Sequence, residues 1–298
     1  MNAEDEKASA VELDWAEAAD RLERAAEDDG AWYAAVAGDL VGSGDLLAID
    51  VGCGGAGMAI ALARRLTDEG RVLAIDGDDE VLQGARRTIA AAGSDASRVA
   101  VHRIDLHGGL GGVAELIGSG GVDVIWASGV VHHLGDQQQA IDHLAGLLAP
   151  GGRLALAEGG LGVRHLPWDV GVGQQGLEVR LTEAFDRWFL RMRQELPQAV
   201  RMPYGWPAAL RAAGLASVST STTVLERPTP LEDAQRRAIA ETLSWRVERA
   251  TSIDAIPPAD LDAWGRLLDE VDAAWIGRRD DLYDLSARSV HVGYRQEP

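Results

Sequence analysis

The stretch that decides the fold is residues 46–57, Leu-Leu-Ala-Ile-Asp-Val-Gly-Cys-Gly-Gly-Ala-Gly. Its first six residues predict a buried strand, and the residues from Gly57 to Leu66 predict a helix. Between the two, Gly52, Gly54 and Gly57 have the spacing G-x-G-x-x-G. Glycines without Cβ atoms let the backbone approach a nucleotide closely, with a helix N-terminus directed at it. The stretch therefore predicts a nucleotide-binding turn, with a purely structural turn as the alternative.

The same alternation of strand and helix continues to about residue 158. Strands that alternate with helices of 10–15 residues indicate right-handed βαβ units and a parallel sheet covered on both faces. We therefore expect an α/β fold with a doubly wound sheet. The predicted strands are 46–51, 72–75, 99–104, 122–127 and 153–158, and the helices between them include 57–66, 80–92 and 137–148.

The segments on either side of this core are less regular. Residues 1–44 predict a helical cap, and residues 45–298 predict one domain with insertions at about 161–206 and 228–283. A strand at 288–294 closes the chain. The predicted helices of these segments are 9–26, 31–40, 181–193, 206–213, 231–250 and 259–277, and a further strand is predicted at 216–224.

Composition limits the functions that the chain can have. The net charge is −19, from 28 Lys and Arg against 47 Asp and Glu, and such a surface repels nucleic acid and anionic lipid. No apolar run reaches the ~18–20 residues that span a bilayer, and the acidic first residues differ from a signal peptide, so we expect a cytoplasmic protein. The single cysteine, Cys53, predicts neither an intrachain disulfide nor a thiolate metal site, and no acidic cluster predicts a metal.

Two carboxylates follow predicted strands of the core. Asp76 ends the second strand, roughly 20 residues beyond the glycines, where a carboxylate can accept both hydroxyls of a ribose. The alternative role is the N-cap of the next helix, which Asp78 would serve equally well. Asp105 ends the third strand and could accept a hydrogen bond from an adenine amino group, or be an ordinary turn residue.

Together these features resemble class I S-adenosylmethionine-dependent methyltransferases, in particular the small-molecule group similar to methyltransferase types 11 and 25. The resemblance includes Asp50 before the glycines, the segment Trp126-Ala-Ser-Gly-Val-Val-His-His-Leu134 and the turn Pro150-Gly-Gly152. It covers about residues 45–160 and implies a Rossmann-like seven-stranded sheet whose last strand is antiparallel and lies between the fifth and sixth. One departure is Ala56, which stands where the family usually has its third glycine.

The resemblance implies S-adenosyl-L-methionine as the cofactor, with Asp76 at its ribose and Asp105 and Leu106 around its adenine. Trp32 and Tyr33, just before the core, are expected to close over it. The residues expected at the cofactor are Asp50, Gly52, Cys53, Gly54, Asp76, Gly77, Asp105, Leu106, Ser128, Trp32 and Tyr33.

A catalytic base is needed only when the methyl acceptor is protonated at the working pH. His132 and His133 follow the fourth strand, at the sheet edge where α/β proteins bind ligands, and imidazole titrates near neutrality. The alternative is that one histidine packs under the loop and orders it. The residues expected to bind the substrate, with ordinary core packing as the alternative, are Trp188, Arg191, Tyr204 and Trp206.

These features predict methyl transfer to an O or N nucleophile of a small organic molecule or peptide, with specialised metabolism as the expected setting. A protein of this fold that binds the cofactor but acts as a cyclase or scaffold is one alternative. An NAD-dependent oxidoreductase is the second, and it is disfavoured because Lys7, the only lysine, cannot form a Tyr-x-x-x-Lys pair. The acidic charge disfavours a nucleic-acid methyltransferase. The sequence is compatible with a homo-oligomer.

Overall fold

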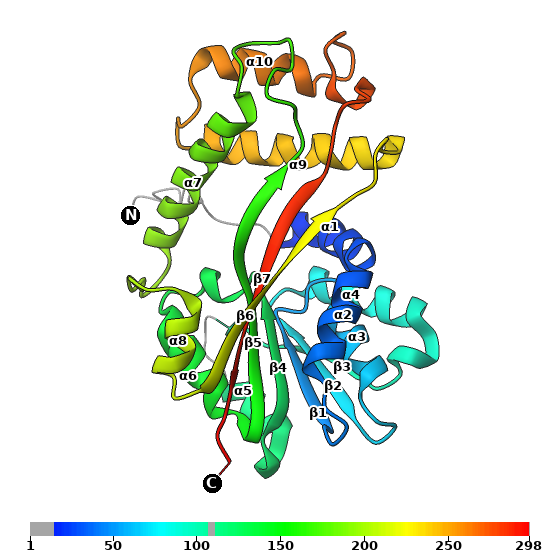
Figure 1. Ribbon diagram of the computed structural model, residues 1–298, viewed down its shortest axis with the longest axis vertical. Coiled ribbons are helices and arrows are strands. Elements are labelled where there is room, and N and C mark those ends of the chain that lie inside the picture. The colour runs from blue at the N-terminus through cyan, green and yellow to red at the C-terminus, as the bar shows by residue number, and fades with distance from the viewer. Residues whose placement is uncertain (1–14, 107–110, 298) are drawn as a thin grey trace, which may run out of the picture. The chain divides into compact units, whose positions relative to one another are not determined.

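The computed structural model describes residues 15–106 and 111–297 (Figure 1). Within these residues, seven strands form one sheet in the order β3-β2-β1-β4-β5-β7-β6. The strands β1 to β5 pair in parallel. β7 runs the opposite way, since Arg295, just beyond its end, bonds to Gly151 and Gly152 near the start of β5. The expected Rossmann-like sheet, with its last strand between the fifth and sixth, is confirmed.

The bounds of the elements agree closely with the predicted ones over most of the chain. The strands are β1 Leu47–Val51, β2 Arg71–Asp76, β3 Val99–Arg103, β4 Val122–Ser128, β5 Leu148–Arg164, β6 Ala216–Glu226 and β7 Leu285–Tyr294. The helices are α1 Trp15–Asp28, α2 Gly30–Leu40, α3 Gly57–Arg65, α4 Asp79–Ala92, α5 Gly111–Ile117, α6 Gln137–Gly146, α7 Leu177–Glu195, α8 Trp206–Ala212, α9 Asp233–Thr251 and α10 Pro258–Leu268. Residues 9–14 of the first predicted helix lie outside the described residues.

Two predicted boundaries are wrong. β5 extends to Arg164 instead of ending at 158, because Gly160 lets it continue beside β7: a Cβ there would lie 2.1 Å from the carbonyl oxygen of Ala287. The helix predicted to reach 277 ends at Leu268. Beyond it the side chains of Asp269 and Asp272 accept hydrogen bonds from backbone N–H groups two residues later, and such local bonds compete with a helix.

The chain divides into two compact units, which we describe separately. The first, here called the sheet unit, includes the described residues 15–106, 111–159, 197–221 and 289–297. Its core lies at the centre of the sheet, where all five residues of β1 are buried. Strands buried on both faces read as continuous apolar runs, which is why the sequence predicts them well.

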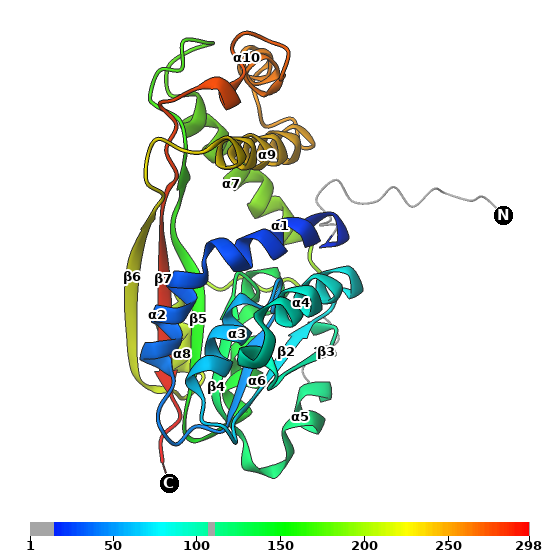
Figure 2. The same ribbon diagram turned by 90° about the vertical axis from the view of Figure 1, so that its right-hand side faces the viewer.

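Helices pack on the parallel strands and on one another in this unit. α2 packs on α3, and α1 lies beside α4, as Figure 2 shows. The register places Asp50 of β1 opposite Trp126 of β4, and Asp76 of β2 opposite Arg103 of β3. Parallel strands present their carboxyl ends at the same edge, so the residues that end β1, β2 and β4 gather there.

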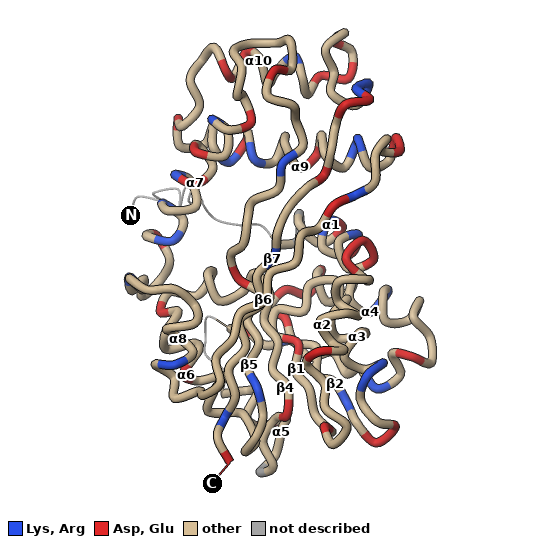
Figure 3. The backbone as a smooth tube through the Cα atoms, viewed as in Figure 1, with Lys and Arg blue, Asp and Glu red and all other residues tan. Residues whose placement is uncertain are grey.

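The second unit, here called the helical unit, consists of residues 160–196 and 222–288 among those described. α7, α9 and α10 bury a core of their own that includes Trp264, Leu243 and Leu181. Basic residues are scattered among acidic ones along the tube of Figure 3. None of the described helices is both long and apolar enough to cross a membrane.

Candidate active site

The glycine turn joins β1 to α3 and has a left-handed backbone at three positions. These are Gly52, Gly54 and Ala56, with φ of 62°, 50° and 63°. A Cβ at Gly52 would lie 2.2 Å from a methyl group of Val130, so this residue also has to be glycine for lack of space. Ala56 has a backbone conformation that glycine adopts more easily, and this agrees with the glycine that the resemblance leads us to expect there.

The last glycine of the pattern, Gly57, has a different role. Its φ is not positive, but a Cβ there would lie 2.7 Å from the ring of Tyr33. The expected neighbour Trp32 is buried and contacts the rings of Tyr33 and Trp126, whose centroids are 5.1 Å and 5.8 Å from its own. Of these two aromatic residues, Tyr33 is therefore the one that the structure brings to the glycine turn.

Helix α1 lies against the same turn. A Cβ at Gly55 would lie 2.5 Å from the carbonyl oxygen of Leu22 and 2.8 Å from Cβ of Ala26. An ion pair of 2.6 Å between Glu23 and Arg87 links α1 to α4. The N-terminal helix therefore belongs to the surroundings of the turn, and glycine at position 55 is required by this close approach.

Asp50 is a buried carboxylate at the end of β1. It is 2% exposed, and its Oδ2 accepts a hydrogen bond of 2.9 Å from the backbone N–H of Ala59 in α3. Burial raises the pKa of Asp50 from 3.8 to about 7, with the charge of Asp76 adding to the effect. Among the described residues, none forms an ion pair with Asp50. A positively charged group of a ligand would therefore stabilise the ionised form of this buried carboxylate.

Asp76 is joined to the glycine turn rather than to the following helix. Its Oδ2 accepts from Gly54 N–H at 3.2 Å, and its Oδ1 accepts from Asp78 N–H at 3.3 Å. Burial raises the pKa of Asp76. Asp78 is the N-cap of α4, since its side chain accepts from the N–H groups of Glu80 and Val81. The structure thus assigns the N-cap of α4 to Asp78 and not to Asp76.

The other residues expected at the cofactor occupy nearby strand ends or the core. Asp105 is exposed just after β3, with its Cα 3.7 Å from where a Cβ of Gly77 would be. Leu106 packs partly buried against the core of the sheet unit, and Ser128 ends β4. Burial raises the pKa of the Cys53 thiol well above its usual value, so this thiol is not a nucleophile at neutral pH.

Glu158 is a polar residue of this edge that the sequence did not single out. It lies in β5, is 2% exposed and accepts hydrogen bonds from the N–H groups of Val130 at 3.0 Å and Val131 at 2.8 Å. Its other oxygen lies 2.6 Å from Nδ1 of His132. The available signal was its position at the end of a predicted strand, the same signal that identified Asp76.

The two expected bases differ in their surroundings. His132 contacts the Glu158 carboxylate, whereas the ring of His133 stands edge-on to Trp15 of α1 at 4.9 Å. The two imidazole rings are 4.1 Å apart. Both histidines therefore lie in one cluster, and His132 is the one with a buried carboxylate beside it.

The backbone of Glu158 is linked by hydrogen bonds to β7 and, through β7, to β6. Its carbonyl oxygen accepts a hydrogen bond of 3.1 Å from Nε2 of His291 in β7, and Nδ1 of His291 lies 2.8 Å from the hydroxyl of Thr220 in β6. Burial lowers the pKa of His291, which keeps the ring neutral. Since Nε2 donates, Nδ1 accepts the Thr220 proton, and the backbone at Glu158 is fixed by three strands.

The four residues expected to bind a substrate belong to two different units. Trp188 and Arg191 belong to α7 of the helical unit, where Trp188 is buried beside Phe185 and Arg191 pairs with Glu195. Tyr204 and Trp206 belong to the sheet unit. There the Tyr204 hydroxyl donates to Gln138 at 3.0 Å, and Trp206 packs partly buried against the core.

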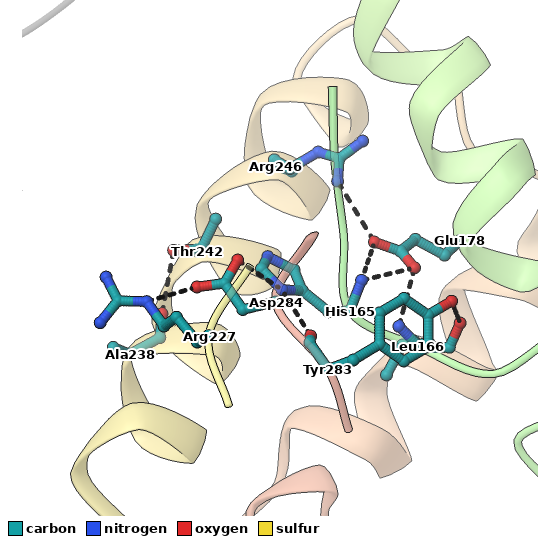
Figure 4. A network of polar contacts seen from close by, with 9 residues as sticks. All are labelled: His165, Leu166, Glu178, Arg227, Ala238, Thr242, Arg246, Tyr283 and Asp284. Carbon is teal, nitrogen blue, oxygen red and sulfur yellow. Dashed lines mark hydrogen bonds and ion pairs between the residues drawn. The ribbon is translucent and has the colours of Figure 1, made fainter. Parts of the chain in front are cut away.

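A buried polar network organises the helical unit (Figure 4). The carboxylate of Glu178, near the start of α7, accepts from the N–H groups of His165 and Leu166 and lies 3.8 Å from Arg246 of α9. The Tyr283 hydroxyl donates to the carbonyl oxygen of Leu166 at 2.6 Å. These bonds join the end of β5 to α7, α9 and the segment before β7, so we assign the network a structural role.

Comparison with known proteins identifies the domain that carries this site. Residues 49–154 match the family described as "Methyltransferase domain". An uncharacterized methyltransferase of Mycobacterium tuberculosis is 31% identical over 124 residues, which are 42% of this chain and 56% of that protein. An uncharacterized 37.1 kDa protein in a transposon of Streptomyces fradiae is 31% identical over 111 residues, which are 37% of this chain and 29% of that protein.

The chain thus covers about half of the mycobacterial relative and less than a third of the Streptomyces one. Among solved structures, the YcgJ protein from Bacillus subtilis is 15% identical with a TM-score of 0.48, covering 89% of this chain and 98% of that one. The family match runs from β1 into β5, the part that holds the glycine turn, Asp50 and Asp76. Residues 49–154 are therefore similar to the methyltransferase domain family, in line with the resemblance to class I methyltransferases.

Proposed function

We propose that the protein transfers a methyl group from S-adenosyl-L-methionine to an O or N nucleophile of a small organic molecule or peptide. The observation that carries the proposal is the pair of buried carboxylates beside the glycine turn. Asp50 has no ion-pair partner among the described residues, and Asp76 is bonded to Gly54 of the turn. When bound, the cofactor supplies a methyl group on a positively charged sulfur.

The residues at this edge fit such a cofactor chemically. The ammonium group of its methionine portion would supply the positive charge that the Asp50 carboxylate lacks. Asp76 would accept the two ribose hydroxyls, which are donors that a carboxylate at the end of β2 can hold together. α1, which lies on the turn, would restrict access of water to that part of the site.

Of the two histidines, we propose His132 as the base when the acceptor must lose a proton. Its imidazole is 24% exposed at the side chain and touches a carboxylate that is 2% exposed. A partly exposed ring beside a buried carboxylate can exchange protons with a bound molecule while its position stays fixed. His133, which packs against Trp15, is assigned to the ordering of the loop.

Calorimetric titration of S-adenosylmethionine and its demethylated product tests the cofactor. The variant is Asp76→Asn, which has the same shape without the charge, and the matched control is Asp78→Asn at the cap of α4. A hydrogen bond to a charged group contributes about 1.5–3 kcal/mol, so we expect Asp76→Asn to bind at least about tenfold more weakly. Equal weakening by the control, or binding of NADH in place of S-adenosylmethionine, would contradict the proposal.

A further inference from the structure

We propose that Glu158 is a positioning residue that fixes His132 in its Nδ1–H tautomer, so that Nε2 takes the proton of a hydroxyl group on the methyl acceptor. This inference rests on the proposed function and gives it a substrate class, a phenol or alcohol. It assigns a role to Glu158, a residue of β5 that lies outside the glycine turn and is linked by hydrogen bonds to the segment after β4.

The contact between the two side chains determines where the proton of His132 lies. Oε2 of Glu158 is 2.6 Å from Nδ1 of His132, a distance typical of a hydrogen bond to a charged acceptor. An ionised carboxylate can only accept, so Nδ1 must carry the hydrogen. In a neutral imidazole the remaining lone pair is then on Nε2, which is the atom that can act as a base.

The carboxylate has no freedom to turn away from the histidine. Oε1 of Glu158 accepts two backbone N–H bonds, from Val130 and Val131, which orient the whole group. The backbone of Glu158 is held in turn by His291, which is bonded to Thr220. A partner that is itself held by hydrogen bonds keeps the base that it contacts in one orientation.

This arrangement is useful to one class of acceptor in particular. An aromatic amine already has a lone pair at neutral pH, and an aliphatic ammonium ion can pass its proton to water before it reacts. A thiol with a pKa of about 8.5 ionises in part near neutral pH. A phenol, with a pKa of about 10, and an alcohol keep their protons at neutral pH, so transfer to oxygen requires a base. The His132–Glu158 pair therefore points to methyl transfer to oxygen.

The step balances in atoms and charge. A lone pair of the acceptor oxygen forms the new O–C bond as the C–S bond breaks and its electron pair stays on sulfur. The hydroxyl proton passes to Nε2 of His132. The imidazolium so formed is stabilised by the Glu158 carboxylate at 2.6 Å, and its proton is later released to water.

Nitrogen NMR of protein labelled in its seven histidines measures the tautomer without a substrate. His132→Gln identifies the signals of His132 by their loss. We expect Nδ1 of His132 to show the shift and coupling of a protonated ring nitrogen and Nε2 those of an unprotonated one. A wild-type spectrum in which Nε2 carries the hydrogen would overturn the proposal.

Glu158→Gln makes a sharper test, because its only oxygen must serve the N–H groups of Val130 and Val131. Its amide nitrogen then faces Nδ1 of His132 as a donor, and the hydrogen is expected to move to Nε2. Unchanged signals from the other histidines confirm that this variant is folded. A variant in which His132 keeps the Nδ1–H tautomer would show that Glu158 does not fix it.

The acceptor class is tested by the product formed in a screen of hydroxyl, amine and thiol compounds. We expect a methyl ether whose rate of formation falls about 100-fold or more in His132→Gln and in Glu158→Gln. An N-methyl or S-methyl product, formed equally fast by His132→Gln, would refute the hydroxyl assignment. Failure of the wild type to bind S-adenosylmethionine, with the expected tautomer present, would refute the proposed function alone.

Discussion

Asp50→Asn is expected to stabilise the protein without cofactor, and increasingly so as the pH rises. Burial raises the pKa of Asp50 from 3.8 to about 7, so the folded protein holds this proton more tightly than the unfolded chain does. The cost of ionising the buried carboxyl therefore grows above pH 3.8 and levels off above about pH 7. At 1.36 kcal/mol per pH unit, the full cost is about 4 kcal/mol.

Asparagine removes this cost and keeps the local geometry. Its side-chain oxygen can still accept the hydrogen bond from Ala59 N–H, which is 2.9 Å long in the structure. Between pH 5 and pH 8, the stability advantage of the variant over the wild type is expected to grow by about 2–3 kcal/mol. The wild type has this carboxylate because, in our proposal, it binds the positive charge of the cofactor.

Urea unfolding of both proteins at pH 5 and pH 8, without cofactor, measures the difference. Asp79→Asn, at a carboxylate whose side chain is 68% exposed, is the control for the loss of one negative charge from a protein of net charge −19. An advantage of Asp50→Asn that is the same at both pH values, after this control is subtracted, would refute the reasoning. The same variant should lose affinity for S-adenosylmethionine.

Three further outcomes follow from the surroundings of the glycine turn. Gly52→Ala places a Cβ 2.2 Å from Val130 at a φ of 62°. Thermal unfolding should therefore show that the free energy of unfolding falls by about 2 kcal/mol or more. A decrease below about 0.5 kcal/mol would contradict this packing. Arg87→Ala removes the exposed ion pair with Glu23. The free energy of unfolding should change by under ~1 kcal/mol, while amide hydrogen exchange in α1 becomes faster. Unchanged exchange in α1 would show that the ion pair does not hold this helix. Burial raises the pKa of Cys53, so iodoacetamide at pH 8 should alkylate it only in urea, and rapid labelling of the folded protein would contradict its burial.

Most of the sheet could be predicted because its determinants are local. A strand buried on both faces, such as β1, reads as a short apolar run, and the glycines that follow it mark the turn. The end of α10 was missed because Asp269 and Asp272 bond to nearby backbone groups, and the sequence pattern does not show whether such bonds or the helix prevail.

The site could be predicted only in part, for a related reason. Asp76 and Asp78 are two residues apart, and both could cap α4 by sequence alone; the structure distinguishes them by the bond from Gly54 to Asp76. Glu158 depends on the pairing of β4 with β5 and on His291, which is 133 positions later in the chain. Contacts over such distances leave no periodic pattern in the sequence.

The position of β7 in the sheet has a consequence for how the chain folds while it is being synthesised. Among the described strands, β6 is attached to the sheet only through β7, because β7 lies between it and β5. While residues 285–294 are still unsynthesised, β5 has an open edge and β6 has no strand beside it. The methyltransferase domain match ends at residue 154, yet the last side of the sheet closes only after residues 285–294 have been synthesised. An exposed strand edge can pair with another chain, so this interval is when the nascent protein is most vulnerable to aggregation.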